Sequence, residues 1–250
     1  LAFNFKIRNG AINYDNSTVP VSNLFLNFDT KLPSLDVEKL QVNLDSVFLN
    51  VGNDYFKAII KSTGMKNPKI DATIKASMDL QKMNRAFGIQ NLDVKGILNA
   101  DIIAKGNYNK DLKLYPVTKG TIELKNGFLK TEYYPNPIKN INLNAKIVNS
   151  KGTAKDMHID INQTSFIFEG KPFTMNASFQ NLDDIAYDIK AKGELDLTKI
   201  YKIFSQKGLD LDGFIKMDVA FQGKQSDATN GNYTKLKNSG ILELRNIKVN

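Results

Sequence analysis

One pattern of residues occurs twice in this chain, and the duplication limits the fold more than any other feature of the sequence. The stretch "MDLQKMNRAFGIQNLDVKGILNADIIAKGN" begins at Met78, and "LDLTKIYKIFSQKGLDLDGFIKMDVAFQGK" begins at Leu195. Aligned without a gap at a shift of 117 residues (195 − 78 = 117), they share Asp, Leu, Lys, Phe and Gly positions. The same shift places "IRNGAINYDNSTVPVSNLFLNF", from Ile7, over "LKNGFLKTEYYPNPIKNINLNA", from Leu124. Because Gly, Pro and Asn positions align as well, the pattern predicts tandem copies of one unit.

The repeat continues to the end of the chain. The segment "GILELRNIKVN" from Gly240 copies "GTIELKNGFLK" from Gly120 at a shift of 120 residues (240 − 120 = 120), which predicts a short insertion between Ser226 and Ser239. Since the chain opens on Leu1 and ends inside an expected strand, we interpret it as a fragment of a longer protein. The predicted units are residues 1–117 (first β repeat unit), 118–239 (second β repeat unit) and 240–250 (start of a third unit).

Apolar and polar residues alternate along most of each unit. In "INLNAKI", from Ile141, and "FTMNASFQ", from Phe173, every second residue is apolar. This period of two predicts strands with one dry and one wet face, as in antiparallel sheets. We therefore predict a mainly β fold of tandem antiparallel β-sheet repeats, with about five or six strands per unit.

One short helix is expected in each unit. In "DLQKMNRAFG", from Asp79, and "LDLTKIYKIFSQKG", from Leu195, apolar residues recur at helical spacing. Asp79 is placed to cap the first helix, Asp196 or Thr198 the second, and Gly208 to follow its end. A helix this short needs to pack against the sheet to be stable.

The composition removes most catalytic chemistry. The chain has no Cys, no Trp and one histidine, His158, which lies at a polar position of its strand between two aspartates. Neither a metal site nor a phosphate-binding loop is expected, and the repeated Asp101 and Asp218 are interpreted as polar-face residues. No enzymatic activity and no cofactor are predicted. The net charge of +8 comes from dispersed lysines, which indicates a solvated basic surface and not a nucleic-acid site.

The second unit resembles the AsmA family of bacterial envelope proteins. The residues that carry the resemblance are "GKPFTMNASFQN" leading into "YDIKAKGELDLTKI", then "LDLDGFIKMDVAFQGKQSD" and the closing "GILELRNI". The same order of features recurs more weakly in the first unit. The resemblance implies a periplasmic protein of Gram-negative bacteria, anchored to the inner membrane by a segment this chain lacks. It also implies a role in phospholipid transport and outer-membrane biogenesis.

The resemblance further implies a long U-shaped β-sheet with an apolar inner groove, similar to the chorein-type lipid bridges of eukaryotes. A phospholipid or another acyl lipid is then the expected ligand. The alternation supplies candidate lining residues for the groove: Ile122, Leu124, Ile141, Leu143, Phe173, Met175, Ala177, Phe179, Ile215, Met217, Val219 and Phe221.

Two alternatives follow from the same pattern. The apolar side chains could instead meet across a closed sandwich or barrel, which would leave no groove. The chain could also be a structural or chaperone-like module whose exposed sheet edges engage outer-membrane proteins by strand addition.

Overall fold

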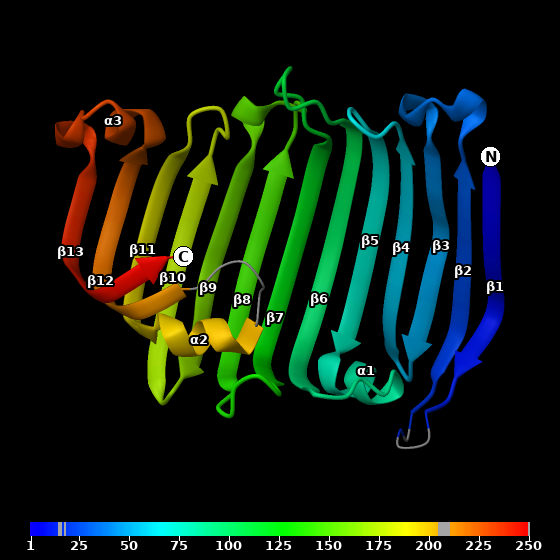
Figure 1. Cartoon of the computed structure of the whole chain (residues 1–250), viewed down its shortest axis with the longest axis horizontal. Coiled ribbons are helices and arrows are strands. Elements are labelled where there is room, and N and C mark those ends of the chain that lie inside the picture. The colour runs from blue at the N-terminus through cyan, green and yellow to red at the C-terminus, as the bar shows by residue number, and fades with distance from the viewer. Residues whose placement is uncertain (15–16, 18, 205–210, 250) are drawn as a thin grey trace.

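The chain folds into one open antiparallel sheet. The computed structural model describes residues 1–14, 17, 19–204 and 211–249, and within them each of the 13 strands pairs with the next strand in the sequence (Figure 1). Alternation of apolar and polar residues and short connections favour this up-and-down order. The strands are β1 (Ala2–Ile12), β2 (Val21–Lys31), β3 (Gln41–Val51), β4 (Asp54–Thr63), β5 (Lys69–Asp79), β6 (Leu92–Asn107), β7 (Val117–Thr131), β8 (Ile138–Asn149), β9 (His158–Phe168), β10 (Lys171–Gln180), β11 (Ala186–Asp196), β12 (Leu211–Lys224) and β13 (Lys237–Val249).

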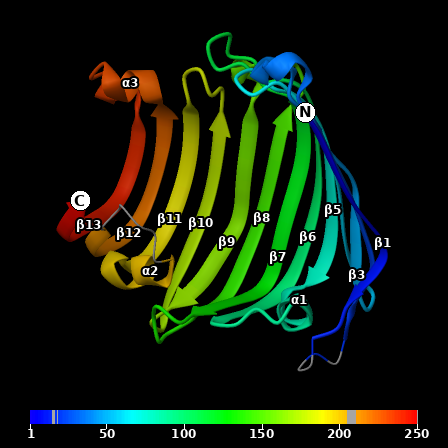
Figure 2. The same ribbon diagram turned by 45° about the vertical axis from the view of Figure 1, so that its right-hand side comes forward.

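The prediction of a mainly β, antiparallel fold is confirmed, and the sheet is open: β1 and β13 lie at opposite edges and do not pair with each other. The described residues contain no second sheet, so the closed sandwich is wrong for this part of the chain. Figure 2 shows that the strands do not form a flat layer and that the sheet curves from β13 to β1.

Two helices follow equivalent strands and lie at the same end of the sheet (Figure 1). Helix α1 (Leu80–Ala86) follows β5, and its first turn is capped by Asp79, whose Oδ1 accepts hydrogen bonds from the backbone N–H groups of Gln81 and Lys82 at 2.9 and 3.2 Å. Helix α2 (Leu197–Phe204) follows β11, and Asp196 Oδ1 accepts from the Lys199 N–H at 3.1 Å. Gly208, the expected end signal of α2, lies outside the described residues.

A third helix, α3 (Gln225–Thr229), lies in the connection between β12 and β13, so the described chain has three helices where one per unit was expected. That connection spans residues 225–236, three residues more than the corresponding connection 108–116 between β6 and β7 (12 − 9 = 3). The extra length therefore falls in the segment where the shift of the sequence pattern changes from 117 to 120 residues.

Several local features recur at the shift of 117 residues. The bounds of β9, β10 and the end of β11 follow those of β3, β4 and β5 at this distance. Asn9 and Asn126 both have a left-handed backbone conformation (φ 51° and 52°), and each lies at an irregularity in the strand pairing. Asparagine is among the few residues that tolerate this conformation, so these bulges are encoded locally.

The two faces of the sheet differ in chemistry. Strand register joins apolar side chains into rows that cross many strands, for example Ile102 with Gly120, Gly120 with Ile147 and Ile147 with Ile159. We call this side the apolar face; it also carries Leu49, Phe56, Ile74, Ala100, Leu124, Phe173 and Val219. The opposite side, the polar face, carries Tyr55, Ser77, Lys75, Asp101, Lys192 and Asp218.

Buried residues of the described ranges form three small clusters on the apolar face and no single large core. One cluster packs Ala86 of α1 on Val21 and Leu49, and another packs Ile203 of α2 on Ile138 and Phe168. The third contains Phe173, Ala191 and Val219, and no described helix lies over it. Within the part of the chain that the structure describes, the helices therefore cover the apolar face only at one end of the strands.

Candidate functional site

All twelve residues predicted to line a groove lie on the apolar face. Leu124 pairs with Leu143 and Ile122 with Ala145 across β7 and β8, and Ala145 leads through Ile161 to Ala177 on β10. Met175 pairs with Ala191, which pairs with Val219 on β12. Because side chains alternate along a strand, the other predicted residues of β8, β10 and β12 share this face.

The predicted residues differ in exposure. Phe173, Ala177 and Val219 are buried, whereas Ile122 on β7 is 36% exposed. The remaining eight are half-buried. A strand residue that packs only against its neighbours in a single sheet keeps much of its surface in contact with solvent, which explains this intermediate burial.

The prediction omitted strands that lie between the predicted ones. Strand β9 contributes Ile159, Ile161 and Phe166, and β11 contributes Ile189 and Ala191. The alternation in "MHIDI" and "YDIKAKG" carries the signal for these residues. The apolar face is thus continuous from β7 to β12, without a gap at β9 or β11.

The apolar face also continues into the first half of the chain. Across β6 and β7, Leu98 pairs with Leu124 and Ala100 with Ile122. Across β5 and β6, Ala76 pairs with Ala100. No charged side chain interrupts these rows, because lysines and aspartates of the same strands occupy the alternate positions.

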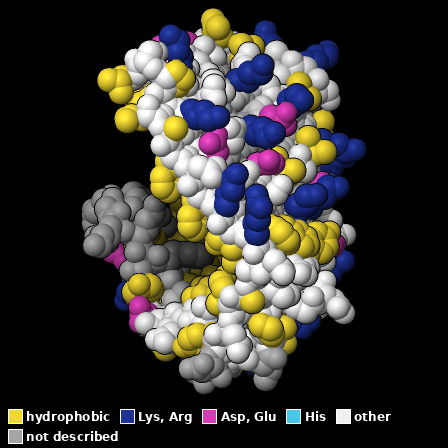
Figure 3. Space-filling model, turned by 90° about the vertical axis from the view of Figure 1, so that its right-hand side faces the viewer, with side chains coloured by type: hydrophobic (Ala, Val, Ile, Leu, Met, Phe, Trp, Pro, Cys, Tyr) yellow, Lys and Arg dark blue, Asp and Glu magenta, His cyan; other side chains and the backbone are white. Residues whose placement is uncertain are grey.

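In the space-filling view, hydrophobic side chains line a recess, whereas many Lys and Arg side chains project from the surface away from this recess (Figure 3).

Cross-strand ion pairs organise the polar face. Lys75 and Asp101 lie 3.5 Å apart, and the equivalent Lys192 and Asp218 lie 2.7 Å apart. The hydrogen bond to Asp218 raises the pKa of Lys192 above its ordinary value. Charge is therefore concentrated on the face opposite to the candidate site.

A polar cluster connects the loops beneath α2. Glu169 Oε1 accepts hydrogen bonds from Tyr134 Oη at 2.9 Å and from Asn136 Nδ2 at 2.7 Å, and its Oε2 lies 3.6 Å from Lys199 Nζ of the helix. The hydrogen bond from Asn136, followed by that from Tyr134, lowers the pKa of Glu169. The cluster links α2 to the β7–β8 and β9–β10 connections.

The single histidine has a local partner. His158 Nε2 lies 2.9 Å from Asp160 Oδ1 on the polar face, while Asp156, the other neighbouring aspartate, belongs to a 3₁₀ turn and accepts a hydrogen bond from the Lys151 N–H. Asp156 therefore precedes β9 and does not lie on the strand beside His158, where the sequence predicted it. Within the described residues, no group of three potential ligands could hold a metal ion.

The fold and the site define a class: a single curved antiparallel sheet with one continuous apolar face and one charged face. Comparisons with known protein families, with curated proteins and with solved structures find no match for the chain. No helix within the described ranges has the length and apolar character needed to cross a membrane.

Proposed function

We propose that the apolar face binds the acyl chains of phospholipids and that the chain contributes to phospholipid transport. The observation that carries the proposal is the unbroken row of apolar side chains on a face that, among the described residues, α1 and α2 cover at one end. Monomeric soluble proteins rarely expose a large contiguous apolar surface, and such surfaces usually bind a partner or a ligand.

An acyl chain matches this face in shape and chemistry. The described residues of this face include no charged group and no regular set of hydrogen-bonding side chains, so the face favours a long apolar ligand. Burial of such a chain gains about 0.8 kcal/mol per methylene, so contact with several strands gives substantial binding energy. The exposed Ile122 and the half-buried Met175 supply surface that a ligand can cover.

The tandem arrangement supports movement along the face as well as binding. In our proposal, each unit is one sheet module with a helix at its end, and the modules form one U-shaped groove. The Leu98–Leu124 and Ala100–Ile122 pairs join the two modules without a polar break. Repetition of the module would lengthen the apolar path, which a transport role requires.

The resemblance to the AsmA family supports a location in the periplasm. There the chain would act between the inner and the outer membrane, with attachment through parts of the protein outside this sequence. The proposal assigns no catalytic residue, because the aspartates that recur in the sequence cap helices or form ion pairs on the polar face.

Lipid analysis of matched variants tests the proposal. The protein is expressed in bacteria, purified without detergent and examined by native mass spectrometry and lipid extraction. Met175→Asp places a carboxylate on the apolar face, and Thr174→Asp places the same group on the polar face one residue away. We expect bound phospholipid in the wild type and in Thr174→Asp, and its loss in a folded Met175→Asp. If Met175→Asp does not fold, Ile122→Asp replaces it as the test variant, because Ile122 is more exposed and its substitution disturbs packing less.

A second candidate function rests on the open edges. The outer sides of β1 and β13 have no partner strand within the described residues, and Ile241 and Leu244 of β13 are 72% and 55% exposed. These edges favour a chaperone-like role in which segments of outer-membrane proteins add as strands. Protection of β1 or β13 amides from hydrogen exchange by an outer-membrane strand peptide, with no effect of lipid, would support this role instead.

A further inference from the structure

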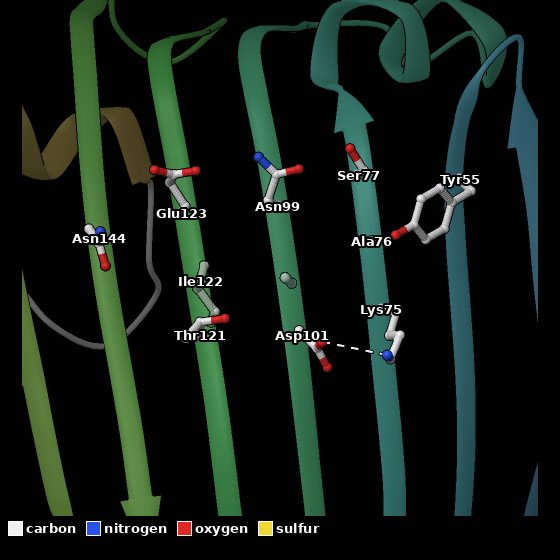
Figure 4. Close-up of a pocket in the computed structure, with 11 residues that line it drawn as sticks. Tyr55, Lys75, Ala76, Ser77, Asn99, Asp101, Thr121, Ile122, Glu123 and Asn144 are labelled. Carbon is white, nitrogen blue, oxygen red and sulfur yellow. Dashed lines mark ion pairs between the residues drawn. The ribbon is translucent and has the colours of Figure 1, made fainter.

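A depression of about 510 Å³ lies on the polar face, opposite to the proposed lipid site (Figure 4). It crosses five neighbouring strands, β4 to β8. One row of its lining is set by strand register: Tyr55 pairs with Ser77, Ser77 with Asn99, Asn99 with Glu123 and Glu123 with Asn144. Five polar side chains from five strands therefore lie side by side.

The depression results from differences in side-chain length. Ser77 and Thr121 are short, whereas Tyr55 and Lys75 are long and rise beside them (Figure 4). Beneath the polar side chains, the alanine at position 76 adds no bulk to this face. The depression is a consequence of the sequence at these strand positions and needs no loop to form it.

Hydrogen-bonding groups in the depression are available to a ligand. No hydrogen bond between described residues uses the side chain of Ser77, Thr121 or Asn144. Together these side chains offer hydroxyl and amide groups that both donate and accept. The Tyr55 ring, which is 38% exposed, adds a flat apolar surface with a polar tip.

Both carboxylates that line the depression are paired with lysines. Asp101 is paired with Lys75 at 3.5 Å, and Glu123 is paired with Lys125 at 2.8 Å. Each lining carboxylate therefore has a lysine partner, and the hydroxyl and amide groups of Ser77, Thr121 and Asn144 are left for a ligand. These groups favour a hydroxyl-rich ligand.

We infer that this depression is a binding site for a neutral oligosaccharide, lying across the strands from Tyr55 to Asn144. Sugars combine many hydroxyl groups with apolar C–H patches, and a row of hydroxyl and amide side chains beside an exposed aromatic ring complements both. Neighbouring strands are about 4.8 Å apart, so four intervals span about 19 Å, which accommodates a short chain of sugar rings. The open shape suits an extended ligand more than a single enclosed sugar. This inference is independent of the proposed lipid function, since the two sites lie on opposite faces.

Saturation-transfer NMR and calorimetry with defined sugars test the inference. The probes are cellotetraose and chitotetraose, with tetragalacturonate as the acidic comparator. We expect at least one neutral probe to bind, with a dissociation constant that rises about tenfold in Tyr55→Ala, as expected for loss of one stacking contact. Asn99→Ala is a second variant that weakens binding without altering the ring. Tyr233→Ala removes an exposed tyrosine outside the depression and is expected to bind as the wild type does.

Three results would overturn the inference: no binding of either neutral probe at millimolar concentration, stronger binding of the acidic probe, or equal binding by the wild type and both depression variants. Bound phospholipid is measured in the same variants. Tyr55→Ala is expected to retain it, so failure of the sugar site and failure of the lipid site give different results.

Discussion

Phe166 and Phe173 stack across β9 and β10, with ring centroids 5.0 Å apart and ring planes inclined by 23°. Both rings lie on the apolar face, and the buried Phe173 belongs to the cluster that contains Ala191 and Val219. No helix within the described residues covers this cluster, so neighbouring strands provide the packing seen there. The stack therefore stabilises the open part of the sheet directly.

Replacement of Phe173 is expected to destabilise the protein strongly. Phe173→Ala removes a buried ring and its stacking contact with Phe166, so we expect the free energy of unfolding to fall by about 3 kcal/mol in urea denaturation. Thr174→Ala, on the exposed polar face of the same strand, is expected to change it by less than about 0.5 kcal/mol. Equal effects of the two substitutions would show that the apolar face contributes little to stability.

Much of this arrangement could be predicted from the sequence because strand side chains alternate with a period of two. That period alone placed Ile141, Leu143, Phe173 and Met175 on one face, and the register of the strands bears this placement out. The caps of both helices were also predictable, since Asp79 and Asp196 stand directly before helical spacing begins.

Other features depend on relations between strands that the sequence does not state. Whether the apolar residues face a second sheet or an open side depends on the curvature of the whole sheet, so the closed alternative remained possible. The depression near Ser77 depends on which side chains become neighbours across five strands. Helix α1 shows a smaller difference. Phe87, one of the apolar residues at helical spacing in "DLQKMNRAFG", lies beyond the end of the helix and is 38% exposed, whereas Ala86 is buried.

The cap of α1 is expected to contribute measurably to stability. Asp79→Ala leaves the N–H groups of Gln81 and Lys82 without their acceptor, so we expect a loss of about 1 kcal/mol in the free energy of unfolding. Asp71→Ala is the matched control, because Asp71 only forms an exposed ion pair with Lys105 at 3.1 Å and such pairs contribute little. A larger loss in Asp71→Ala than in Asp79→Ala would contradict this assignment.

The polar cluster beneath α2 predicts a dependence of stability on acidic pH. Hydrogen bonds from Asn136 and Tyr134 lower the pKa of Glu169 below its ordinary value of 4.5. A lowered folded-state pKa means that ionised Glu169 stabilises the folded state above about pH 4.5, and that this contribution is lost as the pH falls through the lowered pKa. We expect Glu169→Gln to reduce the decrease in melting temperature over this range, measured by circular dichroism.

Asp160→Asn is the control for that titration. Asp160 contacts His158 on β9 and lies outside the cluster around Glu169. If Glu169→Gln and the wild type lose melting temperature in parallel from pH 6 to pH 3, then Glu169 does not contribute to the acid sensitivity.

Gly96 is expected to tolerate no side chain. Its φ of 118° is a conformation that other residues rarely adopt, and a Cβ atom would lie 2.8 Å from the Gly127 Cα and 2.9 Å from the Lys125 carbonyl oxygen. Gly96→Ala therefore combines backbone strain with a clash against backbone atoms, which cannot move aside as a flexible side chain can. Gly170→Ala is the control, because Gly170 also has a positive φ, 74°, but a Cβ there would meet no atom within 4 Å.

We expect Gly96→Ala to lower the free energy of unfolding by about 2 kcal/mol more than Gly170→Ala does, measured in urea. Gly213, at the shift of 117 residues from Gly96, has the same φ of 118°, and its Cβ would lie 2.8 Å from the Arg245 carbonyl oxygen. Gly213→Ala should therefore destabilise the sheet in the same way, because both glycines lie where a strand pair is irregular and the backbones approach closely. Equal effects of Gly96→Ala and Gly170→Ala would mean that the positive φ, and not the close approach of the strands, determines the need for glycine.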